Sequence, residues 1–261
     1  MEGKRLLWII DAHVHLFSSA DITVNEELIR QANLNNIEWL CISSLGRKWK
    51  YVPSMKDCIQ ANNDVLRFMK MHSDRVLGWC YINPREDGAI KEIERCIAKG
   101  MIGIKLWVAC RANEPPVFRV IEKAIDLNVP VLQHSWFKAT GNLPHESTPY
   151  DVATLAKEYP DAKIIMAHLG GDWELGLKAV RDCENVYVDT SGNYPEMGMI
   201  EAAVKELGAK RVIFGSDAPG RNFCVEISKI MAAEIEQKEK ECILKFNMLQ
   251  LLKGRLTNYD L

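Results

Sequence analysis

Short apolar runs recur along the chain, and longer stretches with apolar residues at helical spacing separate them. The runs are rich in β-branched and aromatic residues and almost continuously apolar, as strands covered on both faces must be. Eight such runs are present, at 6–15, 37–45, 75–84, 101–109, 129–136, 162–170, 185–192 and 211–219. We therefore predict eight buried strands.

The stretches between these runs predict helices. Residues 89–100 carry apolar side chains at helical spacing and end at Gly100, a favourable residue for closing a helix. Residues 115–128 open with two prolines, which suit a first helical turn. Further helical segments are expected at 25–36, 64–74, 151–160, 195–209 and 224–253.

Eight strands that alternate with helices favour one parallel sheet with right-handed crossovers. The 261 residues contain no linker and no low-complexity segment, and this length is ordinary for one barrel of about 250 residues. An open doubly wound sheet would want a G-x-G-x-x-G turn after its first strand, whereas this chain continues there as DAHVHLF. We predict an α/β fold, a single-domain (β/α)8 TIM barrel with parallel strands that spans residues 1–261.

Composition narrows the classes of partner. Hydrophobic residues make up 48% and charged residues 26% of the chain, and the net charge of -2 leaves no basic excess for nucleic acid or an anionic membrane. The eight cysteines are scattered without a C-x-x-C pair, which indicates reduced, buried thiols. No apolar stretch approaches the roughly 20 residues of a membrane span, and the N-terminal run is too short for a signal peptide. We expect a cytoplasmic protein with a small-molecule substrate, and a homodimer remains open.

Histidines concentrate at the ends of the predicted strands. The chain has six histidines, and His13, His15, His134 and His168 all fall at strand ends. The carboxyl ends of barrel strands meet at one rim, where Lys105 and Asp217 are also expected. His13 and His15 are two residues apart on an extended segment, so both rings can face the same way. Imidazole and carboxylate without thiolate suit zinc, and also manganese, iron or nickel.

Each of these residues alone has a structural explanation, as a core histidine, an ion-paired lysine or a turn aspartate. Six of them at one rim favour a metal site instead. In combination, the motifs IDAHVH, GIKLW, AHLGG and FGSDAP resemble the amidohydrolase superfamily, in particular the amidohydrolase-2 type that includes aminocarboxymuconate semialdehyde decarboxylase. The resemblance covers essentially the whole chain, and Asn247 stands where the family's closing helix carries an asparagine.

The resemblance implies a divalent metal held by His13, His15, His134 and Asp217. In a one-metal site, which we favour, His168 polarises the substrate or a bound water. In a two-metal site His168 is a ligand and a carboxylated Lys105 bridges the ions. Lys105 is therefore either a bridging carbamate or a cation for the substrate. Zinc is the first expectation for the metal, with manganese as the alternative.

The expected activity is hydrolysis of an amide, ester or lactone in a small anionic molecule by a metal-activated water. Asp217 would move the protons, and His168 would stabilise the developing oxyanion. Arg111 and Arg221 are candidate partners for the anionic substrate, and Trp107 and Trp136 are candidate pocket walls. The alternative is a metal-dependent, non-oxidative decarboxylase, because the resemblance implies one ligand set for both reactions. A non-catalytic binding barrel would predict a degraded ligand set, which this chain does not have.

Overall fold

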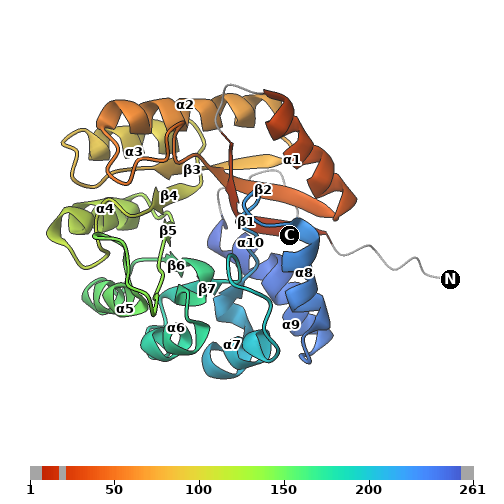
Figure 1. Cartoon of the computed structure of the whole chain (residues 1–261). Coiled ribbons are helices and arrows are strands. Elements are labelled where there is room, and N and C mark those ends of the chain that lie inside the picture. The colour runs from red at the N-terminus through yellow and green to blue at the C-terminus, as the bar shows by residue number, and fades with distance from the viewer. Residues whose placement is uncertain (1–7, 18–21, 254–261) are drawn as a thin grey trace.

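Eight parallel strands form the barrel that the sequence predicts. The computed structural model describes residues 8–17 and 22–253, and its strands pair in chain order from β1 to β8 (Figure 1). The strands are β1 (Ile9–His15), β2 (Ile37–Ser43), β3 (Val76–Tyr81), β4 (Gly103–Leu106), β5 (Val131–Gln133), β6 (Ile164–Met166), β7 (Val186–Asp189) and β8 (Val212–Ile213). Every neighbouring pair is parallel, so the predicted (β/α)8 barrel is confirmed.

The barrel closes between β8 and β1 through the segment that follows β8, because β8 itself has only two residues. The backbone N–H of Asp217 donates to the carbonyl of His13 at 2.7 Å. The Asp11 carboxylate adds a side-chain bridge, since its Oδ1 accepts from the N–H of His13 at 3.1 Å and from that of Ser216 at 3.0 Å. This seam is thus built from residues beside and within the predicted ligand set.

The helices form a ring around the strands (Figure 1). They are α1 (Ile22–Leu34), α2 (Met55–Met71), α3 (Ala89–Ala98), α4 (Pro115–Asp126), α5 (Pro149–Glu158), α6 (Trp173–Val180), α7 (Met199–Leu207), α8 (Phe223–Ala232), α9 (Gln237–Glu241) and α10 (Asn247–Leu251). A π-helical turn, η3 (Cys242–Phe246), joins the last two. Residues 1–7 lie outside the described residues. The start of the first predicted run and the prediction about a signal peptide therefore fall outside them too.

Helix α6 is absent from the sequence prediction, and the strand ends differ from it. Helix α6 has only eight residues and contains Gly176, which lowers its helical signal. The glycine is required there because a Cβ would lie 1.9 Å from the carbonyl oxygen of Leu169. Strands β5, β6 and β8 end earlier than their apolar runs, so polar residues assigned to strand ends lie in the turns just beyond.

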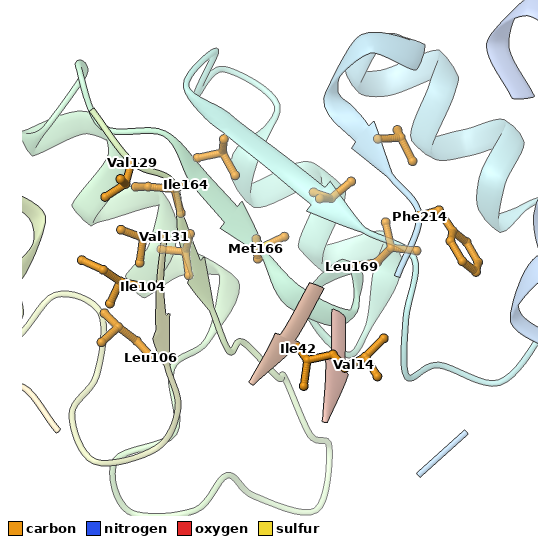
Figure 2. Close-up of a cluster of buried hydrophobic side chains, with 14 of the residues drawn as sticks. Val14, Ile42, Ile104, Leu106, Val129, Val131, Ile164, Met166, Leu169 and Phe214 are labelled. Atoms are coloured by element: carbon orange, nitrogen blue, oxygen red, sulfur yellow. The ribbon is translucent and has the colours of Figure 1, made fainter. Parts of the chain in front are cut away.

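Alternation along the short strands separates two apolar layers. Val131, Ile164 and Met166 belong to the layer between the strands and the helices (Figure 2). Their neighbours Leu132 and Ile165 belong to a second cluster, which α10 completes with Met248 and other residues. The residue two positions after Leu132 shares its face of the strand, which directs position 134 toward the barrel axis.

Most of the cysteine side chains lie in the interior. All eight cysteines are free, and six of them are buried. Across residues 8–17 and 22–253, none of the helices combines the length and the apolar character needed to cross a membrane.

The loop between β2 and α2 is anchored by a capping box. Ser54 Oγ accepts from the N–H of Asp57, and the Asp57 carboxylate accepts from the N–H of Ser54. Lys50 from the loop also donates to Asp57 at 2.8 and 3.0 Å. The hydrogen bonds from Lys50 and Ser54 lower the pKa of Asp57 to about 2. This anchor holds the segment that carries Trp49 over the barrel mouth.

Replacing Asp57 by Asn should reduce the free energy of unfolding by about 1 kcal/mol near neutral pH, the usual size of an N-terminal cap. Because folding lowers the pKa of Asp57 from 3.8 to about 2, its stabilisation is complete above about pH 5 and is lost as the pH falls through about 2. Urea unfolding of both proteins between pH 2 and 7 measures the difference. A difference that stays constant down to pH 2 would show that the carboxylate is not what the cap depends on.

Candidate metal centre and active site

The six residues predicted at the rim lie around one cavity of about 170 Å³ at the carboxyl ends of the strands. His13 and His15 belong to β1 and Lys105 to β4. His134 follows β5 directly, and His168 lies in the 3₁₀ turn η1 (Ala167–Gly170) after β6. The full lining of the cavity is His13, His15, Leu45, Trp49, Lys105, Trp107, His134, Trp136, His168, Asp217, Pro219 and Gly220.

His13, His15 and Asp217 form one cluster of potential ligand atoms, and His13, His168 and Asp189 form a second. In the first cluster, the two histidine Nε2 atoms are 3.2 Å apart, and Asp217 Oδ1 lies 3.2 Å from Nε2 of His15 and 3.8 Å from Nε2 of His13. Both histidines are buried, whereas the Asp217 side chain is 26% exposed. Two nitrogens and one carboxylate oxygen within this range can share a single divalent ion.

The outer nitrogen of three of the rings is bonded in a way that fixes its proton. His13 Nδ1 lies 2.8 Å from Asp189 Oδ2, and His134 Nε2 lies 3.0 Å from Glu146 Oε1. His168 Nδ1 lies 2.9 Å from Ser191 Oγ, whose own proton goes to Asp189 at 2.6 Å. A carboxylate only accepts, so each of these outer nitrogens carries the proton and donates it.

The inner nitrogens of these rings therefore carry no proton, and their lone pairs point into the cavity. His168 Nε2 and His134 Nδ1 face each other at 3.2 Å although neither carries a proton. His15 is bonded on its outer side to Ser43 Oγ at 2.9 Å, and a hydroxyl serves either tautomer. Converging lone pairs repel one another unless a cation lies between them. The donor chemistry thus fits a divalent metal, with ring orientation fixed by outer carboxylates as in known metal sites.

Asp189 is the hub of this arrangement, and the sequence analysis did not select it. Its carboxylate accepts from the His13 ring, from the N–H and hydroxyl of Ser191, and from the N–H of His168 at 2.9 Å. Oδ1 accepts three of these bonds and Oδ2 accepts the one from His13, so Asp189 orients both histidines. The signal that could have found it is an acidic residue at the end of the seventh apolar run, in VDTSG.

Glu146 has the same role for His134. It lies in the long segment between β5 and α5, and only 2% of its surface is exposed. Lys138 donates to it at 2.7 and 2.8 Å. Burial opposes its ionisation, but the bonds from His134 and Lys138 lower its pKa to about 2, so it stays a carboxylate. Its distance of twelve residues from His134 gives no local pattern by which the sequence could reveal it.

Burial sets the protonation of the remaining groups. It lowers the pKa of His15 to about 4 and that of His168 well below its usual value, so both rings are neutral at pH 7. Burial opposes the ionisation of Asp217 too, but its bond to His15 and the neighbouring rings hold its pKa well below the usual range. Burial also lowers the pKa of Lys105 to about 8. Its Nζ lies 2.8 Å from His13 Nε2, beside the ligand cluster.

His168 reaches the cavity through an unusual backbone turn. His168 and Leu169 have φ of 63° and 48°, and Gly170 and Gly171 continue in the positive-φ region. A left-handed residue other than glycine costs on the order of 1–3 kcal/mol and persists only where its surroundings fix it. Here the N–H of His168 is held by Asp189, and its carbonyl accepts from Nδ2 of Asn193 at 2.7 Å. The turn directs the ring inward at a point where the strand has already ended.

The candidate substrate residues divide into two groups. Trp107 and Trp136 line the cavity, and the Trp136 ring lies 5.0 Å from the His168 ring. Arg111 is exposed and does not line this cavity. Arg221 lies over the ring of Tyr194 and lines a neighbouring cavity that shares Pro219 with the first.

Trp49 is a third tryptophan in the wall, and the sequence analysis did not select it. Its ring centroid lies 6.3 Å from those of His15 and Trp107. Three indoles therefore surround a polar floor.

Comparison with known proteins agrees with this geometry. The sequence model of the amidohydrolase family matches residues 10–253, which is most of the chain. The chain belongs to the amidohydrolase family. The resemblance drawn from the motifs is thereby confirmed, and so is an enzyme of this superfamily with a candidate divalent-metal site. No curated protein matches the sequence.

Solved structures share the fold of this amidohydrolase at low sequence identity. A 2,6-dihydroxybenzoate decarboxylase from Rhizobium aligns with a TM-score of 0.74 at 17% identity, covering 95% of this chain and 99% of the other. A manganese-bound 5-carboxyvanillate decarboxylase variant from Novosphingobium aromaticivorans gives 0.77 at 14% identity, covering 96% and 98%. A 4-oxalomesaconate hydratase from Rhodopseudomonas palustris gives 0.70 at 18% identity, covering 95% and 96%.

The amidohydrolase should contain about one equivalent of divalent metal when it is purified without chelators. His13→Ala and Asp217→Ala should each remove most of it, because each deletes a ligand from the cluster of His13, His15 and Asp217. Elemental analysis also decides between zinc and manganese. Arg111→Ala, outside the cavity, is the matched control. Metal content that is equal in all four proteins would contradict this ligand set.

Proposed function

We propose that this amidohydrolase is a metal-dependent, non-oxidative decarboxylase of a small, planar carboxylic acid with one ring or a conjugated chain. The proposal rests on the cavity, whose floor consists of potential metal ligands and Lys105 and whose walls are three indoles. Its volume of about 170 Å³ is below the roughly 300–1,000 Å³ of pockets for drug-sized ligands. Flat apolar walls suit a flat substrate, and the floor suits its carboxylate.

Two considerations favour decarboxylation over the hydrolysis that the sequence analysis put first. Two of the similar structures are named as decarboxylases of aromatic acids. Loss of carbon dioxide leaves an electron pair on carbon, which a conjugated planar molecule can delocalise. Hydrolysis, in contrast, consumes water at the reacting carbon, and the tryptophan walls restrict the room for it.

His13, His15, His134 and Asp217 are the residues that would hold the metal, with His168 at its side. A divalent ion at this site supplies positive charge that orients the carboxylate and stabilises negative charge developing on the substrate. Trp107, Trp136 and Trp49 hold the ring and exclude water from it. Lys105 contributes a buried ammonium group for the substrate's anionic oxygen.

Asp217 is the proposed proton carrier. Its side chain is partly exposed to the cavity, whereas His13 is fully buried. The bond between the ring carbon and the carboxyl carbon breaks, the pair stays on the ring carbon, and that carbon takes the proton from Asp217. The low pKa of Asp217 keeps it ionised at rest, so it first takes a proton from a hydroxyl of the substrate and then passes that proton to the ring carbon. His168 Nε2, an acceptor fixed by Ser191, orients a hydroxyl or water of the substrate complex.

The activity test uses 2,6-dihydroxybenzoate and 5-carboxyvanillate labelled with ¹³C in the carboxyl group. We expect labelled carbon dioxide, and Asp217→Asn should lower kcat by about 10²–10⁴-fold because Asp217 is both a metal ligand and the proton carrier in this proposal. A panel of lactones, esters and amides runs in parallel. Hydrolysis of these, with ¹⁸O from water in the product and no labelled gas, would replace the decarboxylase proposal by the hydrolase.

Lys105→Met separates the two roles left open for this lysine. If Lys105 is the cation for the carboxylate, KM rises roughly tenfold or more, as expected for a lost charge-assisted hydrogen bond, and metal content stays unchanged. A bridging carbamate predicts instead about two equivalents of metal in the parent protein, with loading that depends on bicarbonate, and a loss of metal in the variant whether or not bicarbonate is added. Metal analysis and steady-state kinetics on the same preparations distinguish these results.

A further inference from the structure

A buried ion pair on α8 contacts the loop that follows β7. Glu226 is 1% and Lys229 7% exposed, and Lys229 Nζ lies 2.6 Å from Glu226 Oε2. The same ammonium donates to the carbonyl of Asn193 at 2.7 Å and to that of Thr190 at 3.2 Å. These three acceptors use all three of its protons. An ion pair removed from water is costly, so its presence here calls for an explanation beyond stability.

The contacts of Lys229 lead directly to His168. Asn193, whose carbonyl Lys229 holds, donates from Nδ2 to the carbonyl of His168 at 2.7 Å. Between the two held carbonyls lies Ser191, which fixes the Nδ1 proton of the His168 ring. Gly192 packs against the same ring, because a Cβ there would lie 2.4 Å from its Nδ1. The loop therefore controls both the backbone and the ring of His168.

We propose that the Glu226–Lys229 pair is a positioning device for His168, which acts by holding the 190–193 loop against it. The idea rests on the proposed function, in which His168 faces the substrate. His168 needs such support because it stands in the left-handed region beyond the end of β6, where no strand ladder holds it. Neither member of the pair lines the cavity, so they act only through the loop.

A matched pair elsewhere in the barrel provides the control. Glu92 and Arg95 on α3 have the same i,i+3 spacing, and the carboxylate is again buried. Their other partners are Asn62 and Cys96, and neither residue lines the cavity. Loss of this pair should weaken the fold without changing His168.

The first readout is the imidazole NMR spectrum of the zinc-loaded protein and of the protein without added metal. The Nδ1 proton of His168, bonded to Ser191, is identified by its loss in His168→Gln. In Lys229→Met this signal should shift and exchange faster with solvent, and Asn193→Ala should move the same signal. Arg95→Met should leave it in place. Because Lys229→Met isolates a buried carboxylate, the double variant Glu226→Gln/Lys229→Met serves if the single variant does not fold.

The second readout is catalysis. Lys229→Met should lower kcat roughly tenfold or more while KM changes less than threefold, since ring orientation rather than substrate affinity is lost. Glu226→Gln, which keeps an acceptor for Lys229, should show a smaller decrease. An unchanged His168 signal in folded Lys229 variants, or an equal change in Arg95→Met, would overturn the inference. If the His168 signal moves as expected but no carboxylic acid is consumed, the positioning role is supported and the proposed decarboxylation is wrong.

Discussion

The floor of this cavity depends on two imidazole nitrogens, Nε2 of His168 and Nδ1 of His134, that face each other with no proton between them. Such an arrangement is unfavourable unless every ring is prevented from rotating away and a cation completes it. The chain meets the first condition with acids on the outer side of the rings. Asp189 and Glu146 accept hydrogen bonds from the outer nitrogens of His13 and His134, so the inner nitrogens, which carry no proton, face the cavity. The direction of the lone pairs is thus set by Asp189 and Glu146, which do not line the cavity themselves.

Much of the fold and of the polar lining of the cavity could be predicted because both leave local signals. Buried parallel strands are read as apolar runs, and His-x-His on an extended segment places two rings on one side whatever surrounds it. Lys105, His134 and Asp217 were identifiable because they stand together with other polar residues at the ends of such runs, although each alone has a structural explanation. The barrel then brings these ends together.

The residues that sequence reasoning missed act through the tertiary structure alone. Glu146 meets His134 across a loop, and Trp49 reaches the mouth because the anchored segment before α2 carries it there. Helix α6 was missed because Gly176, which permits its close approach to the turn of His168, weakens its helical pattern. Arg111 follows a strand closely in sequence, but its side chain is exposed and does not line the cavity.

The seam between β8 and β1 has a consequence for the mechanics of the barrel. Only two residues of β8 pair as a strand, and the closing bonds run through His13, Asp217 and the carboxylate of Asp11. The bonds that shut the cylinder are thus the bonds that set the spacing of two ligands. Opening the wall and spreading the ligands are a single motion in this protein. An ion bound by residues on both sides of this closure would stiffen the barrel at the point where the fewest strand residues are paired.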